Sequence, residues 1–136
     1  MTAKFFQKVS TGFTLVELMV TVAIIAILTS VALPSYHNHV TEMRRTAAQS
    51  CLLELVQFTE RYYSNQMTYV GAKLPTLECR TNMTAHYTFT YAVAPTATAY
   101  TLTAIAQGGH ATRDSACNPL QVTQSGVRSP STGCWK

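Results

Sequence analysis

Gly12-Phe13-Thr14-Leu15-Val16-Glu17 opens an aliphatic run that continues to Leu33. Apart from Glu17, only the hydroxyl residues Thr14, Thr21, Thr29 and Ser30 interrupt this run. A helix needs about 20 predominantly apolar residues to cross a bilayer, and residues 13–33 meet that requirement. The stretch therefore predicts a membrane-spanning helix at the start of the chain.

Basic residues lie on only one side of this run. Lys4 and Lys8 precede it, and the next basic residue is Arg44. Because cytoplasmic flanks carry an excess of Lys and Arg, we expect the N-terminus in the cytoplasm and the rest of the chain outside.

Glu17 is the unusual residue of the run. An acidic side chain costs about 2.5–3.5 kcal/mol at the centre of a membrane-spanning helix, less near the interface, and such residues usually serve a function. Glu17 is therefore either a tolerated acid whose carboxylate reaches the interface or a residue with a role in assembly.

A basic leader that ends in Gly12, followed by Phe13 and by Thr14-Leu15-Val16-Glu17 at the start of an apolar helix, resembles the N-terminal signature of type IV prepilins. The resemblance implies that a prepilin peptidase cleaves after Gly12 and methylates the new N-terminus, Phe13. It also implies that Glu17 pairs with the N-terminal amine of a neighbouring subunit. A wrongly staggered neighbour would leave both charges unpaired, so this contact can set the register of assembly.

We therefore expect a cleaved leader at residues 1–12, a transmembrane and assembly helix at 13–33, and a periplasmic or extracellular head domain at 34–136. The chain has 136 residues, which leaves about 100 for one small domain. A hydrophobic content of 47% with 12% charged residues indicates a packed protein rather than a disordered one.

Pro34 follows the apolar run and predicts a bend in the helix, not its end. The helical pattern resumes beyond it, so we expect one helix from Phe13 to about Asn65. One apolar stripe runs along its second part, and Glu42, Arg45, Gln49 and Glu60 fall off the stripe. The stripe consists of Val40, Met43, Ala47, Cys51, Leu55, Phe58 and Tyr62, widened by Ala48, Leu52, Val56, Thr59 and Tyr63.

The second half of the chain predicts strands and loops. Period-two alternation indicates strands at 86–93, 100–107 and 120–124, with an antiparallel hairpin formed by the first two. Residues 64–82 predict a loop, and residues 108–115 predict a second, polar loop. The fold class expected is α+β, a pilin fold in which one long helix packs on a small antiparallel sheet.

Cys51, Cys79, Cys117 and Cys134 are an even set in a region expected outside the cytoplasm, where disulfides persist. No pair has metal-ligand spacing, so two bridges are favoured over zinc, and three connectivities are open. The resemblance to pilins implies a bridge between Cys117 and Cys134, which leaves Cys51 to pair with Cys79.

No catalytic constellation stands out, so we expect neither an enzyme nor a cofactor or metal. His86 and His110 are interpreted as surface or capping residues. The formal charge of +4 would fall to +2 on loss of Lys4 and Lys8. The loop residues Arg80, Arg113, Arg128 and Lys136 could form a nucleic-acid patch, but we expect scattered solvated charges because they form no basic run.

The C-terminal half also resembles the PilE-like minor pilins, in Tyr100-Thr101-Leu102-Thr103-Ala104, the segment ending at Cys117, residues 120–126 and Cys134-Trp135. The resemblance implies a minor subunit of a type IV pilus, anchored in the bacterial inner membrane and then displayed on the surface. Its partners would be other pilins, the peptidase and an inner-membrane assembly platform. Such a subunit supports pilus biogenesis, adhesion, twitching motility or DNA uptake.

Three alternatives stay open. A type II secretion pseudopilin shares the leader and the helix, and a DNA-binding competence pilin shares every feature. The third is a secreted binding protein in which Ser30-Val31-Ala32 is a signal cleavage site. That alternative would leave Glu17 unexplained.

Overall fold

A computed structural model describes residues 12–131 and 133–135 of the chain. The chain divides into two compact units, Met1–His37 and Asn38–Lys136. Helix α1, Leu15–Gln66, begins in the first unit and ends in the second. The leader residues Lys4 and Lys8, and also Lys136, lie outside the described residues.

Helix α1 contains Pro34 within its length, so the prediction that the helix continues past this proline is confirmed. Its bounds lie within two residues of those expected from the sequence. The expected bend at Pro34 stays a prediction. By length and composition, α1 is a helix that could cross a membrane.

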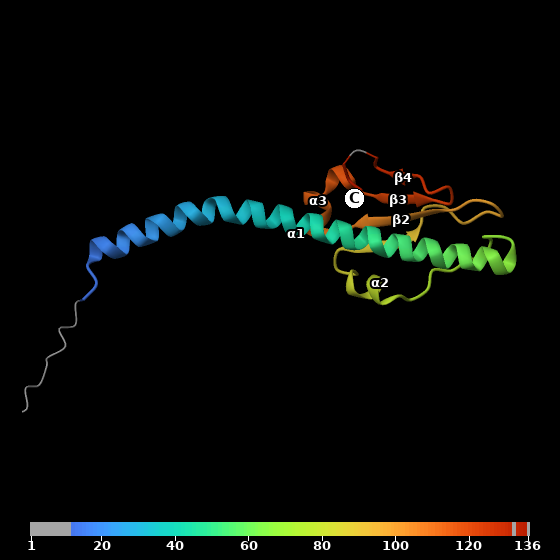
Figure 1. Cartoon of the computed structure of the whole chain (residues 1–136), viewed down its shortest axis with the longest axis horizontal. Coiled ribbons are helices and arrows are strands. Elements are labelled where there is room, and N and C mark those ends of the chain that lie inside the picture. Colours follow the sequence, from blue (N-terminus) through green and yellow to red (C-terminus); the bar gives the residue numbers. More distant parts are fainter. Residues whose placement is uncertain (1–11, 132, 136) are drawn as a thin grey trace, which may run out of the picture. The chain divides into compact units, whose positions relative to one another are not determined.

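The head, residues 38–135, contains a four-stranded antiparallel sheet in the order β1-β2-β3-β4 (Figure 1). Its strands are β1 (Tyr87–Tyr91), β2 (Thr101–Ala106), β3 (Leu120–Thr123) and β4 (Arg128–Ser129). The register places Phe89 beside Ala104, and Ala104 beside Leu120. The three predicted strands are confirmed with slightly shorter bounds, and β4 is an additional edge strand.

The core of the head forms where the second part of α1 meets one face of this sheet. Alternate residues of β1 and β3 are buried, as the period-two pattern predicts, whereas the central strand β2 also buries Thr103 and both residues of β4 are exposed. The core-facing strand residues pack with Ala48, Cys51, Leu52 and Leu55 of α1 in one hydrophobic cluster. The strand residues of this cluster are Tyr87, Phe89, Leu102, Ala104, Ala106, Leu120 and Val122.

Both predicted loops contain short helices that the sequence analysis missed. Helix α2, Glu78–Asn82, lies in the first, and α3, Gly108–Arg113, lies in the second, followed by a 3-10 turn at Ser115–Cys117. Helices this short have weak intrinsic stability in water, and α3 begins with two glycines. Tertiary contacts, described below, therefore decide their formation.

The predicted apolar stripe on α1 is partly wrong. Met43, Ala47 and Phe58 are exposed, whereas Gln49 is buried among the head residues. Arg45 and Glu60 also bond to residues of the head. The buried face of α1 differs from the expected stripe because Arg45, Gln49 and Glu60 form hydrogen bonds with polar groups of the head. These bonds allow polar side chains to face the head, where an apolar pattern predicts only apolar ones.

Candidate functional site

The N-terminal motif begins in an open backbone environment. A methyl group added at Gly12 would meet no atom within 4 Å, and Phe13 is 72% exposed. In this structure the fold itself places no steric demand on a glycine at position 12. A requirement for glycine there would have to come from another protein that reads the site.

Thr14 caps the start of α1. Its hydroxyl oxygen accepts a hydrogen bond from the amide of Glu17 at 3.2 Å, which satisfies one of the free N–H groups of the first helical turn. Glu17 lies in that first turn, where the helix dipole favours a negative charge. The sequence analysis missed this local role, although a Thr followed three residues later by Glu is its known signal.

The part of α1 that follows this motif, residues 18–33, presents a predominantly apolar surface. All described residues from 12 to 39 are exposed. The hydroxyl groups that interrupt the apolar run are bonded internally, since Thr21 donates to Leu18 O, Thr29 to Ile25 O, and Ser30 to Ile27 O. A helix segment that is predominantly apolar on all sides and carries no unsatisfied hydroxyl suits lipid or a bundle of like helices.

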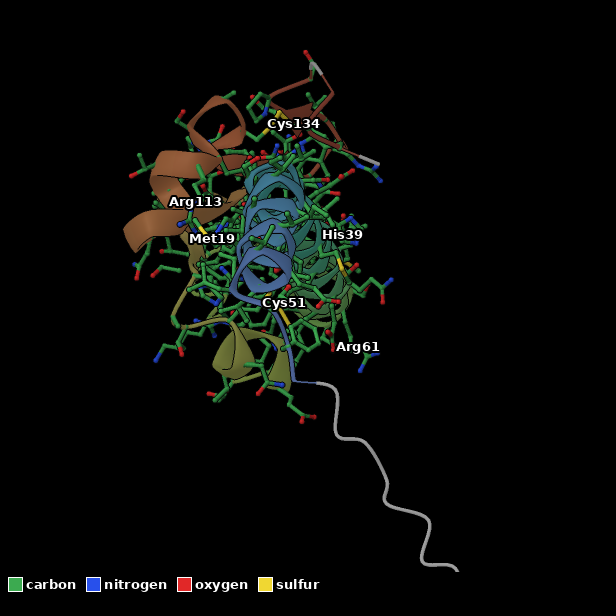
Figure 2. All side chains as sticks on the ribbon, turned by 90° about the vertical axis from the view of Figure 1, so that its left-hand side faces the viewer. Met19, His39, Cys51, Arg61, Arg113 and Cys134 are labelled. Atoms are coloured by element: carbon green, nitrogen blue, oxygen red, sulfur yellow. A yellow bond between two sulfur atoms is a disulfide. The ribbon has the colours of Figure 1, made fainter. Side chains whose placement is uncertain are left out.

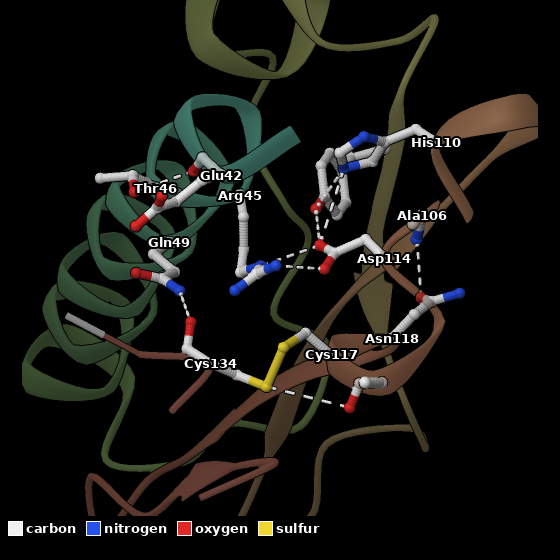
Figure 3. Close-up of polar contacts among 12 residues, drawn as sticks. Glu42, Arg45, Thr46, Gln49, Ala106, His110, Asp114, Cys117, Asn118 and Cys134 are labelled. Carbon is white, nitrogen blue, oxygen red and sulfur yellow. Dashed lines mark hydrogen bonds and ion pairs between the residues drawn. A yellow bond between two sulfur atoms is a disulfide. The ribbon is translucent and has the colours of Figure 1, made fainter. Parts of the chain in front are cut away.

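In the head, a buried polar network links α1 to α3 (Figure 3). Arg45 Nε donates to Asp114 Oδ2 at 2.9 Å, and Arg45 Nη2 donates to Oδ1. The Asp114 side chain is only 2% exposed. A bidentate pair of this kind compensates a charge that would be costly to bury alone.

Tyr87 and His110 complete the network. The Tyr87 hydroxyl donates to Asp114 Oδ2 at 3.2 Å and lies 2.7 Å from His110 Nε2. Burial, reinforced by Asp114, raises the pKa of Tyr87, which keeps its proton available for donation. His110 is buried, so its interpretation as a surface or capping residue is wrong.

The protonation state of His110 follows from its surroundings. Burial lowers its pKa more than the nearby Asp114 raises it. Its Nδ1 is buried without a hydrogen-bond partner, so a proton placed there would be unsatisfied. Because Tyr87 donates to Asp114, we assign the neutral tautomer in which His110 Nε2–H donates to the Tyr87 oxygen.

Glu60 holds a second polar cluster at the far end of α1. Its carboxylate accepts from the hydroxyl of Tyr100 at 2.8 Å and from that of Tyr69 at 3.0 Å. Burial and this acceptor raise the pKa of Tyr69 to about 12. The cluster ties the loop after α1 to the sheet.

Two disulfides close the head. Cys51 is bonded to Cys79 with an S–S distance of 2.06 Å, and Cys117 to Cys134 at 2.00 Å. These are the pairings that the pilin resemblance implies. Gln49 also donates to the carbonyl oxygen of Cys134, so the C-terminal disulfide loop is held against α1.

The four basic residues suggested for a nucleic-acid patch have different environments. The Arg80 guanidinium is hydrogen-bonded within the head, because it donates to the carbonyl oxygens of Leu74, Pro75 and Phe89. Arg113 and Arg128 are exposed. Within the described residues, no group of three His, Cys, Asp or Glu side chains could hold a metal ion.

Comparisons with known proteins agree with this architecture. A solved type IV pilin from Shewanella oneidensis superposes with a TM-score of 0.56 at 28% identity, covering 71% of this chain and 98% of that one. The prokaryotic N-terminal methylation motif matches residues 7–33. The fold and the N-terminal motif together define a type IV pilin.

A more specific family match covers most of the head. The family described as "Type IV minor pilin ComP, DNA uptake sequence receptor" matches residues 34–121. The chain belongs to this family.

Curated relatives match over a shorter region. The type IV major fimbrial protein FimA of Dichelobacter nodosus is 41% identical over 35% of this chain and 38% of its own length. Fimbrial protein EcpC of Eikenella corrodens is 37% identical over 44% of this chain and 39% of its own length. The chain thus spans about two fifths of the length of the curated relatives it matches.

Proposed function

We propose that this chain is a processed pilus subunit whose head binds DNA outside the cell. In this proposal the peptidase cleaves after Gly12 and methylates Phe13, and α1 anchors the chain in the inner membrane with its N-terminus inside. An assembly platform then inserts the subunit into a filament, with Glu17 against a neighbour's N-terminal amine. The match of the DNA uptake sequence receptor family to residues 34–121 carries the DNA-binding part.

The distribution of charge in the head supports this proposal. The acidic residues of the head outside the strand region, Glu42, Glu54, Glu60 and Glu78, all lie on α1 or α2. From residue 79 to the end, the only acid is Asp114, and it is buried against Arg45. The strands and the C-terminal loop therefore present no exposed acidic side chain to repel phosphate.

Exposed cations lie in this region, whose one acidic side chain, Asp114, is buried. Arg113 ends α3, and Arg128 lies on β4 with its guanidinium carbon 5.4 Å from the centre of the Trp135 ring. Trp135 is itself fixed by a bond from its indole N–H to Ser129 O and by the neighbouring disulfide at Cys134. This anchoring holds Arg128 at the surface at a low entropic cost. Arg80 is left out of the proposed site because its guanidinium already donates to three backbone carbonyl oxygens.

The outer face of the sheet adds neutral hydrogen-bonding groups. Thr88 and Thr90 are exposed, and Thr101, Gln121 and Thr123 are partly exposed on the face opposite the core. Hydroxyl and amide groups can contact phosphate and sugar without the cost of an opposing charge. We therefore expect DNA to contact the side of the head formed by the strands and the C-terminal loop.

The test is binding of duplex DNA to the mature full-length chain in detergent micelles, measured by fluorescence anisotropy at several salt concentrations. The double variant Arg113→Ala/Arg128→Ala should bind at least tenfold more weakly, with a smaller dependence of log K on log salt, because about 0.9 counterions are released per phosphate contact. Arg61→Ala is the matched control, since Figure 2 shows Arg61 and Arg113 on opposite sides of the head. No binding at low salt, or equal loss in the control, would contradict the proposal.

A second candidate is a filament subunit that does not bind DNA. The curated fimbrial relatives favour it. They match only about two fifths of the chain, whereas the receptor family matches most of the head. We therefore place DNA binding first.

A further inference from the structure

The segment of residues 108–116, which contains α3, is attached to the rest of the head by few side chains. Only two of its residues are buried, His110 and Asp114, each 3% exposed. Ala111 is partly buried against the core, and the other residues of the segment are exposed. Because few buried apolar contacts hold it, this segment should open at a lower free energy than the sheet.

Both ends of this segment are fixed to the head. At one end the Gln107 amide donates to His86 O at 2.8 Å, and at the other Cys117 is held by its disulfide. Gly108 has a φ of 55°, and a methyl group added at Gly108 or Gly109 would meet no atom within 4 Å. These glycines allow the backbone to turn at the start of α3 without a clash. The segment can therefore move while its two ends stay in place.

His110 takes part in this attachment in its neutral form. Its Nε2 lies 2.7 Å from the Tyr87 hydroxyl, and its Nδ1 is buried with no hydrogen-bond partner among the described residues. In the tautomer assigned above, a second proton would go to Nδ1. The Asp114 carboxylate lies 3.8 Å from Nε2 and already accepts from Arg45 and Tyr87. A buried charged donor without an acceptor is costly, so protonation of His110 favours its transfer to water.

The charges around His110 oppose a further positive charge. Arg45 and Asp114 are already paired with each other. Burial and the nearby Arg44 lower the pKa of His110, and the attraction of Asp114 offsets this only in part. The charged and titratable groups that face His110 are Arg44 and Arg45 of α1, His86 directly before β1, Tyr87 on β1, and Asp114 of its own segment.

We propose that residues 108–116 form an acid-released flap, in which protonation of His110 frees α3 from the head while the sheet and both disulfides stay intact. The released flap exposes His110 to water, where the pKa of histidine is about 6.5. Below this pH the open flap binds a proton that the closed flap excludes, so the ratio of open to closed flap rises by about tenfold per pH unit. Above it both forms are neutral and the closed flap is favoured. Arg113 is exposed on the flap, so its position becomes dependent on pH.

The test is amide hydrogen exchange, followed by NMR, in the mature full-length chain in micelles at pH 7.5 and 5.5. The amides of Ala111 and Asp114 donate to the carbonyl oxygens of Gln107 and His110, so both report closure of the flap. After correction for the intrinsic pH dependence of exchange, their protection should fall about tenfold at pH 5.5. The amide of Leu102, on the central strand β2, should keep its protection within about twofold. Unchanged protection at Ala111 and Asp114, or an equal loss at Leu102, would overturn the inference.

Two variants identify the titrating group. His110→Gln keeps an N–H that can donate to the Tyr87 oxygen but does not titrate in this range, so it should lose the pH effect. His86→Gln removes the neighbouring imidazole, whose ring centre lies 6.1 Å from that of His110, and should keep the effect. A pH effect that survives His110→Gln, or one that disappears in His86→Gln, would overturn the assignment to His110. The wild-type measurement decides whether the flap exists even if a variant fails to fold.

The flap itself does not depend on DNA binding, whereas its link to DNA rests on the proposed function. If the closed flap places Arg113 against phosphate, excess duplex DNA at pH 5.5 should favour the closed form and restore protection at Ala111 by about threefold or more. Arg113→Ala should abolish this restoration and keep the pH effect. DNA that binds without restoring protection would overturn the link. Failure of duplex DNA to bind, with the pH effect intact, would contradict the proposed function and support the flap.

Discussion

The two parts of helix α1 differ in what surrounds them. Every described residue up to position 39 is exposed, whereas seven of the residues between Thr41 and Thr59 are buried. The first part is predominantly apolar on all sides from residue 18 to residue 33 and leaves this apolar surface uncovered, while the second part has one face that the sheet covers. Within one continuous helix, the first part therefore needs a partner from outside the chain and the second does not.

This contrast predicts that substitutions in the first part change assembly and that those in the second change folding. The largest expected effect is that of Glu17→Ala. It should reduce incorporation into filaments to background, because a neighbour's N-terminal amine would lose its carboxylate in an apolar bundle. The measurement is immunoblotting of sheared filaments against the membrane fraction. Head unfolding should not change, and normal incorporation would contradict the assigned role.

Arg45→Ala should destabilise the head, in contrast to Glu17→Ala, which should change assembly and leave head unfolding unchanged. Removing the partner of the buried Asp114 should lower the free energy of unfolding by about 3 kcal/mol, because it leaves an uncompensated charge in the head. Denaturant titration of the full chain in micelles, with disulfides intact, measures this loss. Arg61→Ala, an exposed arginine on the same helix, should cost under about 0.5 kcal/mol. Equal costs for the two variants would show that the network does not stabilise the head.

His110 should make the head sensitive to mild acid. Its folded pKa is lowered, so between that value and the unfolded pKa of about 6.5 the unfolded chain binds more protons. The stabilisation is present above about pH 6.5 and is lost as the pH falls below it. The Tm should therefore decrease from pH 7.5 to 5. His110→Gln should lose most of this dependence and His39→Gln should keep it, and the reverse pattern would exclude His110 as its source.

The smallest effect is expected at the cap of α1. Thr14→Ala removes the acceptor of the Glu17 amide and should weaken the first turn by roughly 0.5–1 kcal/mol. Amide hydrogen exchange by NMR in micelles should show faster exchange at Glu17, with no change in the sheet. Unchanged exchange at Glu17 would mean that the cap does not hold this turn.

The sequence predicts local patterns well and long-range polar contacts poorly. The apolar run, the continuation of the helix past Pro34 and the three main strands all follow from periodicity within short windows. Arg45 and Asp114 are 69 positions apart, and no local pattern links them. When the contact between Arg45 and Asp114 is not known, the sequence of α3 predicts a loop, and His110 is interpreted as a surface residue.

The candidate sites show the same difference between local sequence patterns and long-range contacts. The motif at Gly12 to Glu17 is contiguous, so the sequence alone identifies it. The sequence suggests Arg80 for a basic patch, but its use by three backbone carbonyls is visible only in the fold. The burial of Asp114, which leaves the strand region without an exposed acid, is likewise a tertiary property.

The central claim is that a processed N-terminus and an uncovered apolar helix make this chain a pilus subunit. The most direct test is to measure the mass of its mature N-terminus. Mass spectrometry of the chain from sheared filaments and from membranes should find methylated Phe13 as the first residue in both. A chain that starts at Leu33 in a soluble fraction would contradict the account, because the helix would then be a discarded signal.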